Sequence, residues 1–403
     1  MDLTCQSCRG ISSKGRPVGR GLLVGILLLL VAVSSALAWN RAGPMVSGAI
    51  AYADLKQASP QTLEQVVALL QTHPQFETKW KPQLNQSFVA PDERDLLLFM
   101  LAARWPDDIR PNRAFHHEAW HYITLPYKPE GQPASVQTVE PPPENIVSAY
   151  QTNLDIVRGT APGDRAVALC WVFHLVGDVH QPLHTVQLFT TQFPAPEGDR
   201  GGTRCYIRVR AGASTISLHT FWDDLILGSE RFQSVRNTAI ELRLRPQHAR
   251  PQLPEWTDTS FEHWAKPESF TLAKEQGYRH GQLQGRTEKD DGIVLPADYS
   301  PLTTSIAERR IVLAGYRLAD VLKQTASQET AAASASTPQN SAVPTGTISV
   351  PQASEEIRGN KRSNVYHLPG CPGFAAMSPA NIVMFTSEAE AQQAGYRRAG
   401  NCP

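Results

Sequence analysis

The sequence has no surplus of charge of either sign. It contains 38 lysine and arginine residues against 38 aspartate and glutamate residues, and its isoelectric point is about 7.2. Nothing in this balance indicates a broad basic groove for nucleic acid or a membrane-binding surface. Cysteine is equally scarce, with 6 residues in 403, which excludes a small scaffold held by many disulfides. The chain shows no internal repeat and is long enough for one large domain with its own core and a smaller second unit.

The first 38 residues are typical of a targeting segment. A basic region from Arg9 to Arg20 precedes an apolar run from Leu22 to Val33, and Ala36-Leu-Ala38 fits the small-x-small pattern of a cleavage site. The apolar run is short for a membrane-spanning helix. We therefore expect a signal peptide cleaved after Ala38 and a secreted or periplasmic protein that begins at Trp39. An uncleaved N-terminal anchor, and with it contact with a membrane, is the alternative.

Residues 39–325 carry a helical pattern almost throughout, and we expect one mainly α domain there. Alternation typical of a strand is confined to Cys205–Arg210, which predicts a small β insertion. The proline-rich stretch Pro129–Pro143 predicts a surface loop. Apolar residues at three-to-four spacing predict helices over 49–55, 62–70, 92–104, 145–157, 165–177, 220–227 and 305–322.

The last part of the chain divides in two. Residues 326–354 are rich in Ala, Ser, Thr, Gln and Pro, which predicts a flexible linker. Residues 355–403 regain aromatic residues and cysteine, and we expect a small α+β module there.

The stretch from Leu169 to His184 places polar residues of metal-binding type in an apolar, helix-forming run. His174 and Asp178 are four residues apart, so a helix brings them to one face. Pro182 disfavours continuation of that helix, so we expect the chain to turn and return His184 to the same side. Two imidazoles and a carboxylate that meet in this way form a metal site, and the nitrogen-rich set favours zinc over magnesium or calcium.

Three other segments supply residues of the same type. His219 and Asp223 repeat the four-residue spacing, Asp107 follows a Trp-Pro turn, and His121 follows a tryptophan. Each segment alone has an ordinary explanation, because an Asp after Pro is commonly a cap residue and a lone His is commonly part of the core. Together with His174, Asp178 and His184 they make seven candidate ligands in one domain.

These motifs resemble those of the zinc-dependent S1/P1 nucleases, single-strand-specific enzymes related in fold to the zinc phospholipases C. The resemblance covers residues 39–323 and implies a mainly α fold of the phospholipase C/P1 nuclease type. It implies hydrolysis of phosphodiester bonds in single-stranded DNA and RNA, with 3′-nucleotides as further substrates. The matching residues are Trp39, Trp105-Pro-Asp107 with Arg110, His121, His174, Asp178, His184, Gly198–Gly202, His219 and Asp223.

The same resemblance implies three zinc ions. The first would be held by Asp107, His121, His174 and Asp178, and the second by His184, His219 and Asp223. The α-amine and carbonyl of Trp39 would hold the third, with Asp178 bridging it to the first. An α-amine has a pKa of about 8, so it can lose its proton to a metal near neutral pH. Cleavage before Trp39 would therefore complete the site.

Catalytic and substrate roles also follow from the resemblance. Clustered zinc ions would lower the pKa of water to about 7 at a centre that includes Asp107 and Asp178. Arg110 would stabilise charge on the phosphoryl and leaving oxygens. Tyr122 matches the base-stacking aromatic of the family, and stacking tolerates any base. The residues expected to face the substrate are Tyr122, Thr124, Gly201, Gly202 and Thr203.

Three positions depart from the family pattern. Pro44 stands where the family has a histidine that binds the third zinc, so we expect two tightly bound ions and a third that is weak or absent. Thr124 replaces the acidic residue with which the family reads a base. Thr203 replaces an asparagine and shortens a contact on the phosphate side. The first change bears on catalytic strength, and the other two bear on base preference.

Smaller features leave alternatives open. Cys170 and Cys205 either pair or are separate core residues, and His180 is expected to support the ligands from behind. His116 and His117 are further candidates to replace the histidine missing at position 44. The C-terminal module resembles the zinc-binding module of Ada-type DNA repair proteins. There the four ligand positions are occupied by His367, Cys371, Ala399 and Cys402, so one ligand is missing, and a Cys371–Cys402 disulfide is an alternative to metal.

Two other functions compete with the nuclease. One is a phospholipase C-like zinc phosphodiesterase, and the other is a zinc-binding protein that has lost catalysis, as Pro44 would suggest. Single-stranded nucleic acid or nucleotide is the expected partner in the leading interpretation, and no stable protein partner is implied.

Overall fold

The computed structural model of the chain describes residues 40–335, except 113, 114 and 160, together with part of the C-terminal module. In the module it describes residues 357–399, except 362, 370, 372–373, 375–376, 378–380 and 386. The predicted signal segment and Trp39 lie outside the described residues. Within the described part of the chain, no helix has the length and apolar character needed to cross a membrane.

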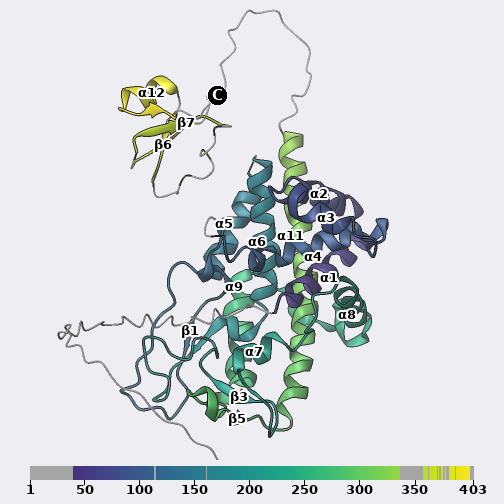
Figure 1. Cartoon of the computed structure of the whole chain (residues 1–403), viewed down its shortest axis with the longest axis vertical. Helices are drawn as coiled ribbons and strands as arrows, with labels where there is room; N and C mark the ends of the chain where they lie inside the picture. Colours follow the sequence, from purple (N-terminus) through teal and green to yellow (C-terminus); the bar gives the residue numbers. More distant parts are fainter. Residues whose placement is uncertain are drawn as a thin grey trace, which may run out of the picture. The chain divides into compact units, whose positions relative to one another are not determined.

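The described chain up to residue 335 is mainly helical, as the sequence predicted (Figure 1). Short 3₁₀ and π turns join the helices, and three of them matter below: η3 (Glu118–His121), η4 (Pro182–Thr185) and η8 (Trp264–Ser269). The helices are α1 (Ala42–Ala58), α2 (Pro60–Gln71), α3 (Lys81–Leu84), α4 (Arg94–Asp108), α5 (Ile146–Val157), α6 (Pro162–Asp178), α7 (Leu218–Asp223), α8 (Phe232–Leu244), α9 (Phe261–His263), α10 (Phe270–Leu272) and α11 (Tyr299–Ala335).

Helix α1 is the centre of the core. It packs against α4, α6, α8 and α11, and for this reason it is apolar on nearly all sides. Small residues allow the close approach: a Cβ atom added at Gly48 would stand 3.0 Å from the carbonyl oxygen of Phe99 in α4. A Cβ atom added at Gly315 in α11 would stand 2.6 Å from the side chain of Ile50. The two glycines thus hold α4 and α11 against opposite parts of α1.

Three helical predictions need correction. Helix α7 ends at Asp223, whereas the sequence predicted a helix as far as residue 227, because the chain leaves helical geometry just beyond Asp224. Helix α8 was missed, although its buried residues Phe232, Val235, Ala239 and Leu242 follow three-to-four spacing. Helix α11 continues to Ala335, beyond the predicted helix end at residue 322, since its alanine-rich end has high helix propensity.

Two small sheets belong to the helical part. β1 (Leu125–Tyr127) and β2 (Val186–Leu188) pair in parallel, and the Ile123 N–H donates to the carbonyl oxygen of His184 at 2.8 Å. These contacts bring the segment that follows His121 beside the segment that follows His184. β3 (Tyr206–Arg208) pairs with β4 (Thr215–Ser217) and β5 (Ile293–Val294), which confirms the predicted strand signal in Cys205–Arg210.

The C-terminal module is a small α+β unit, as predicted. Its strands run in the order β8-β6-β7-β9, with α12 (Glu388–Gln393) packed on β6 and β8. The strand bounds are β6 (Ile357–Asn360), β7 (Val365–His367), β8 (Ile382–Phe385) and β9 (Arg397–Arg398).

The described cysteines decide two of the open alternatives. Cys371 is disulfide-bonded, so its thiolate cannot serve as a zinc ligand. Its partner is neither Cys170 nor Cys205, because both are buried free thiols. The pairing of Cys170 with Cys205 is therefore wrong. Cys402, the predicted partner of Cys371, lies outside the described residues.

Candidate metal centre

The candidate ligands lie at or near the ends of helical segments. Asp107 is in the last turn of α4, His174 and Asp178 are in the last turns of α6, and His121 ends η3. His184 lies in η4, which begins at Pro182 as the sequence predicted, and His219 and Asp223 lie in α7. All seven are buried, with exposed fractions between 0% and 6%. The helical core therefore brings seven polar side chains into its interior.

Asp107, His121 and His174 form the first group, whose candidate ligand atoms all lie within 4.8 Å of one another. His121 Nδ1 and His174 Nε2 are 2.9 Å apart, and His174 Nε2 is 3.9 Å from Asp107 Oδ1. These three residues come from three separate segments, so tertiary packing alone assembles the first group.

His184, His219 and Asp223 form the second group, within the same 4.8 Å limit. His184 Nε2 lies 3.8 Å from Asp223 Oδ1, and His219 Nε2 lies 3.5 Å from Asp223 Oδ2. The two imidazole rings are stacked, with centroids 5.1 Å apart. This group is built mostly within one stretch of the chain.

Asp178 stands between the two groups. Its Oδ2 atom is 2.9 Å from His121 Nδ1 and 3.0 Å from His174 Nε2. Its Oδ1 atom is 3.8 Å from His184 Nδ1. One carboxylate therefore faces both groups with different oxygen atoms, which is the geometry of a bridging residue.

Neighbouring groups fix the orientation of the ligands. The Nδ1–H of His174 donates to the Ala103 carbonyl at 2.8 Å, and the Nδ1–H of His219 donates to the Gly201 carbonyl at 2.6 Å. In both rings the proton on Nδ1 leaves Nε2 as the lone-pair nitrogen that faces its group. The Gln181 amide donates to Asp223 Oδ1 at 2.8 Å. Sequence reasoning missed these contacts, because backbone carbonyls and a lone glutamine carry no recognisable spacing.

The donor set fits metal ions. Zinc bonds of about 2.0–2.1 Å in tetrahedral geometry separate neighbouring ligand atoms by roughly 3.3 Å, and the separations here run from 2.9 to 3.9 Å. Four buried atoms, namely His121 Nε2, Asp178 Oδ1 and both ring nitrogens of His184, have no hydrogen-bond partner. Because buried polar atoms are rarely unpaired, cations are the natural partners of Asp178 and His184.

The electrostatics of the first group are those of strongly coupled charges. Burial alone would raise the pKa of Asp178, but the positive charges of His174 and His184 hold it well below its usual range. Burial opposes the protonated form of His174, yet Asp178 and Asp107 outweigh burial and raise the pKa of His174 to about 9. Burial lowers the pKa of His121 to about 4. A divalent cation would therefore compete with a proton held by His174.

The Gly198–Gly202 turn lies behind His219. Gly201 and Gly202 have φ values of +60° and +86°, and a Cβ atom at Gly201 would meet the Leu183 carbonyl oxygen at 2.6 Å. The carboxylate of Asp199 accepts hydrogen bonds from the Leu188 N–H at 2.9 Å and the Tyr278 hydroxyl at 2.5 Å. Burial raises its pKa to about 6, and hydrogen bonds from the N–H groups of Gly201 and Gly202 oppose that rise. The carbonyl groups of both glycines accept hydrogen bonds from His219, and the expectation that the two glycines face substrate stays a prediction.

The other residues expected to contact substrate lie in two places, beside the first group and next to the glycine turn. The Arg110 guanidinium donates to Asp107 Oδ1 at 2.7 and 3.1 Å. Tyr122 and Thr124 are half-buried, as is Thr203 beside the glycine turn. Burial and the nearby charge of Glu118 raise the pKa of the Tyr122 phenol, while Arg200 lowers it. Tyr122 therefore lies between an acidic and a basic side chain.

His180 contacts groups on α6 and α11 and not the candidate ligands themselves. Its Nδ1–H donates to the Val176 carbonyl at 2.7 Å, and its Nε2 accepts from Arg317 Nη1 at 2.9 Å. Both ring nitrogens are therefore occupied by groups outside the candidate ligand set. His117 stacks on Trp120 with ring centroids 3.7 Å apart.

The start of the described chain is tied to residues next to both groups. The Asn40 amide donates to Asp224 Oδ1 at 2.9 Å and to the Leu227 carbonyl at 2.7 Å. Arg41 Nε lies 3.7 Å from Asp108 Oδ1. Pro44, in the first turn of α1, lies against Gly177, the residue before Asp178.

Two protein-family models match different parts of the chain. The S1/P1 Nuclease family model matches residues 39–327, and a model named ArfC matches residues 334–398. The Ada-type resemblance of the C-terminal module is therefore not confirmed.

Three proteins of Arabidopsis thaliana are similar to this chain. Endonuclease 4 is 26% identical over 247 residues, which cover 55% of this chain and 74% of that protein. Endonuclease 5 is 28% identical over 190 residues (44% and 56%), and Endonuclease 3 is 27% identical over 168 residues (39% and 50%). The alignments span about half the length of the last two relatives. With its family match across well over half of its length, the chain belongs to the S1/P1 nucleases, a family of zinc-dependent enzymes that hydrolyse phosphodiester bonds.

Proposed function

We propose that this nuclease is an exported, zinc-dependent endonuclease that cleaves single-stranded DNA and RNA, with 3′-nucleotides as further substrates. The observation that carries the proposal is the pair of buried ligand groups that share Asp178. Histidine nitrogens outnumber carboxylates among the seven residues, and such a set favours zinc over magnesium or calcium.

Two zinc ions have a complete set of candidate ligands. Asp107, His121, His174 and Asp178 would hold one, and His184, His219 and Asp223 would hold the other. Bound zinc lowers the pKa of water toward neutrality and stabilises negative charge on phosphoryl oxygens. These ions would also supply the positive charge that the overall composition lacks.

Protein side chains would orient the substrate around this centre. Arg110, held against Asp107, brings a guanidinium to the side of the first group and would stabilise charge on a phosphoryl or leaving oxygen. Tyr122 follows the first-group residue His121 and would stack on a base without selecting its identity. Thr124 offers a hydroxyl where the family has a carboxylate, so we expect weak base preference.

A third zinc would depend on the N-terminus. If the chain is cut after Ala38, the free amine and carbonyl of Trp39 become available as ligands. The next two residues reach both groups, because Asn40 contacts Asp224 beside the second group and Arg41 lies close to Asp108 beside the first. Pro44 has no side-chain donor, so this ion would lose its only imidazole. We therefore propose two firmly held ions and a third that is weak or absent.

The proposal is tested with full-length mature protein that begins at Trp39. Zinc per chain is counted after dialysis, and hydrolysis is measured on single-stranded DNA, single-stranded RNA, duplex DNA and phosphatidylcholine. We expect two zinc ions and preferential cleavage of the single strands. Faster hydrolysis of phosphatidylcholine would favour the phospholipase C-like alternative, and zinc without turnover of any substrate would identify a binding protein that has lost catalysis.

Processing is tested by adding residues before Trp39. An extended N-terminus cannot present the Trp39 amine, so the extended protein should be less active than the protein that begins at Trp39. Equal activities would remove the amine from the ligand set. Secretion of a reporter fused to residues 1–45, with cleavage after Ala38, would separate export from an uncleaved anchor.

A further inference from the structure

Two buried arginines lie directly behind the segment that connects Asp178 to His184. Arg310 and Arg317 are seven residues apart on α11, and they are only 4% and 2% exposed. Seven residues are about two helical turns, so both side chains leave the same face. Guanidinium groups are rarely buried so deeply unless they are paired.

Glu268, in η8, is the shared partner of the two arginines. Its Oε2 accepts from Arg310 Nη1 and from Arg317 Nη1, both at 2.7 Å, and its Oε1 accepts from Arg317 Nη2 at 2.6 Å. Two guanidinium charges thus share one carboxylate, while Arg317 also lies 4.6 Å over the ring of Trp264. Apolar side chains could fill such a layer without the cost of removing three charged groups from water. The stability of the core alone does not account for the arrangement.

Arg310 and Ser269 also hold the backbone that leaves α6. Arg310 Nε donates to the His180 carbonyl at 3.3 Å. The Ser269 hydroxyl donates to the Val179 carbonyl at 2.5 Å and accepts from Arg310 Nη2 at 2.7 Å. The carbonyl groups of residues 179 and 180 are therefore both held from α11 and η8.

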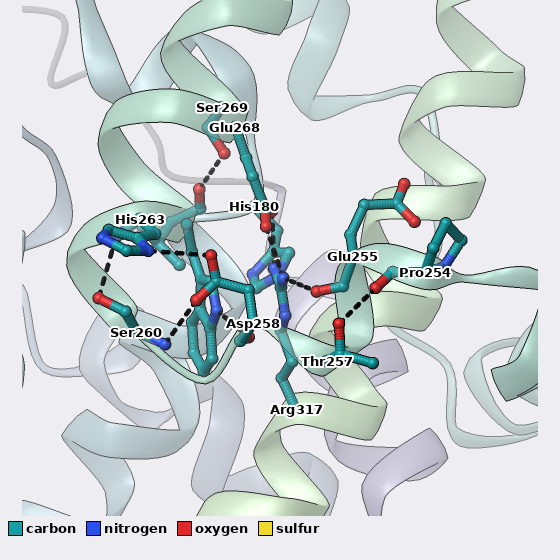
Figure 2. Close-up of polar contacts among 12 residues, drawn as sticks. His180, Pro254, Glu255, Thr257, Asp258, Ser260, His263, Glu268, Ser269 and Arg317 are labelled. Carbon is teal, nitrogen blue, oxygen red and sulfur yellow. Dashed lines mark hydrogen bonds and ion pairs between the residues drawn. The ribbon is translucent and has the colours of Figure 1, made fainter.

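The ring of His180 adds a further connection, visible in Figure 2 beside Arg317 and Glu268. Arg317 only donates hydrogen bonds, so the His180 Nε2 atom that faces it must be the acceptor. The proton then lies on Nδ1 and is donated to the Val176 carbonyl. The Arg317 Nη2 group also donates to the Glu255 carbonyl, which fixes the guanidinium plane. His180 is thus locked to both α6 and α11.

We propose that Arg310, Arg317, Glu268, Ser269 and His180 form a positioning assembly, the arginine brace, which sets the separation between the two candidate metal groups. The braced residues 179 and 180 follow Asp178, which faces both groups, and precede His184 of the second group. A shift of this segment changes the position of His184 relative to Asp178 without moving the first group. The inference rests on the proposed function, since the separation matters only if both groups bind metal.

The test compares variants of the brace with a matched control on the same helix. Ser269→Ala removes the hydroxyl between Arg310 and Val179, and Arg317→Lys keeps the charge but loses the planar fork. Asp320 lies three residues beyond Arg317 and pairs with Arg250 at 2.9 Å, while its other hydrogen bonds come from Trp256 and Lys323. Asp320→Asn therefore disturbs a comparable ionic cluster that does not contact residues 179–184.

Each full-length protein is stripped of metal and titrated with Co²⁺, whose visible absorption bands report ligand geometry. Zinc affinity is measured by competition with a chelator, and thermal unfolding of the zinc-loaded protein is recorded. We expect Ser269→Ala and Arg317→Lys to weaken one zinc site by roughly 10–100-fold, the usual effect of removing ligand support, and to alter the cobalt spectrum. Asp320→Asn should lower the unfolding temperature and leave the spectrum and both affinities unchanged.

The outcomes separate the two proposals. If the brace variants lower the unfolding temperature as the control does but keep wild-type spectra and affinities, the arginine brace is only structural and the inference is overturned. If wild-type protein binds two ions and cleaves no nucleic acid, the proposed function fails while the brace is still tested by spectrum and affinity. Wild-type protein that binds no cation would overturn both.

Discussion

The two candidate ligand groups are held together by different kinds of contact. The first group, Asp107, His121 and His174, is drawn from three distant segments, and its members lie directly against one another and against Asp178. In the second group, His184 and His219 lie 3.8 and 3.5 Å from the carboxylate of Asp223. The Gly201 carbonyl and the Gln181 amide hold His219 and Asp223 in place. A backbone carbonyl thus holds one histidine in each group, but the contacts of 2.9 and 3.0 Å between ligand side chains lie around the first group and Asp178.

This difference predicts which substitutions should disturb several residues of the site and which should disturb only one. A change in the charge of the first group alters several residues at once, because His121, His174 and Asp178 lie within hydrogen-bond distance of one another. A change in the supports of the second group moves one histidine or one carboxylate. Asp178 faces both groups, so a substitution at this residue should disturb both of them.

The largest effect is expected from Asp178→Asn. Loss of this carboxylate removes the charge shared by both groups, so we expect more than a ~100-fold loss of hydrolysis, beyond the range for residues that only support a ligand. Asp223→Asn affects only the second group, so its loss of activity should be at least about tenfold smaller than that of Asp178→Asn. Rates on single-stranded DNA and zinc per chain are measured for both variants. Equal, mild losses would remove the bridging role from Asp178.

Gly201→Ala should damage the second group alone. The new Cβ atom would stand 2.6 Å from the Leu183 carbonyl oxygen at a φ of +60°, so the turn must shift away from His219. Positive φ alone costs roughly 1–2 kcal/mol for a residue with a side chain. Gly212→Ala is the matched control, because Gly212 also has positive φ but nothing lies within 4 Å of its added Cβ. Only Gly201→Ala should weaken zinc binding, by about 10–100-fold.

If Gly212→Ala impaired zinc binding as much as Gly201→Ala, general loss of stability would explain both results. The role of the Gly201 carbonyl in holding His219 would then be contradicted. Urea unfolding of both variants supplies the stability comparison.

The next largest effect is expected in the pH dependence of zinc binding to the first group. The pKa of His174 is raised from 6.5 to about 9, so without metal its protonated form contributes stability that is fully present below pH 6.5. That contribution is lost as the pH rises through about 9. Zinc must displace the same proton, so its affinity for the first group should rise about tenfold per pH unit between pH 6.5 and 9.

Zinc affinity measured at pH 6.5, 7.5 and 8.5 checks this dependence. His174→Gln should remove the proton-coupled part of the slope, whereas His219→Gln should retain it. A first-group affinity that is flat across this range would show that charge coupling does not control the group.

The smallest effect is expected from Pro44→His. Pro44 lies in the first turn of α1, where a backbone N–H has no helical partner, so replacement of proline should be tolerated there. The new imidazole would lie near Asp178 through the contact of residue 44 with Gly177. We expect the third ion to bind about tenfold more tightly, with a few-fold increase in rate at low zinc. Three ions retained by wild-type protein through dialysis would instead show that another residue supplies the ligand.

Local spacing explains which parts of this molecule could be predicted from sequence. His174 and Asp178 share a helix, and the turn at Pro182 follows from the chemistry of proline, so the geometry of α6 and η4 was accessible. The predicted strand in Cys205–Arg210 was confirmed for the same reason. Contacts between distant segments were not accessible: the Ala103 carbonyl is 71 residues from His174, and Arg317 is 137 residues from His180. The supporting role expected for His180 could be stated without its partner, because spacing from Asp178 does not reveal Arg317 on α11.

The end of α7 and the whole of α8 show a second limit. The apolar residues beyond Asp223 continued a helical spacing, but α7 ends at Asp223 and Asp224 caps it, its N–H donating to the carbonyl of Thr220. In α8, buried Phe232, Val235, Ala239 and Leu242 follow three-to-four spacing, but the many polar residues between them make the segment hydrophilic overall, and the helix was missed. Domain boundaries from composition remain a prediction.

The placement of Asp107, His174 and Asp178 in the last turns of α4 and α6 has a consequence for substrate entry. The carbonyl end of a helix carries roughly half a negative charge, so two helix ends add to the field of the carboxylates at this point. Without metal, the buried carboxylates and the two helix ends would repel a phosphate group that approaches the site. Cations reverse the sign of that field, and metal removal should therefore abolish the binding of single-stranded DNA as well as its cleavage.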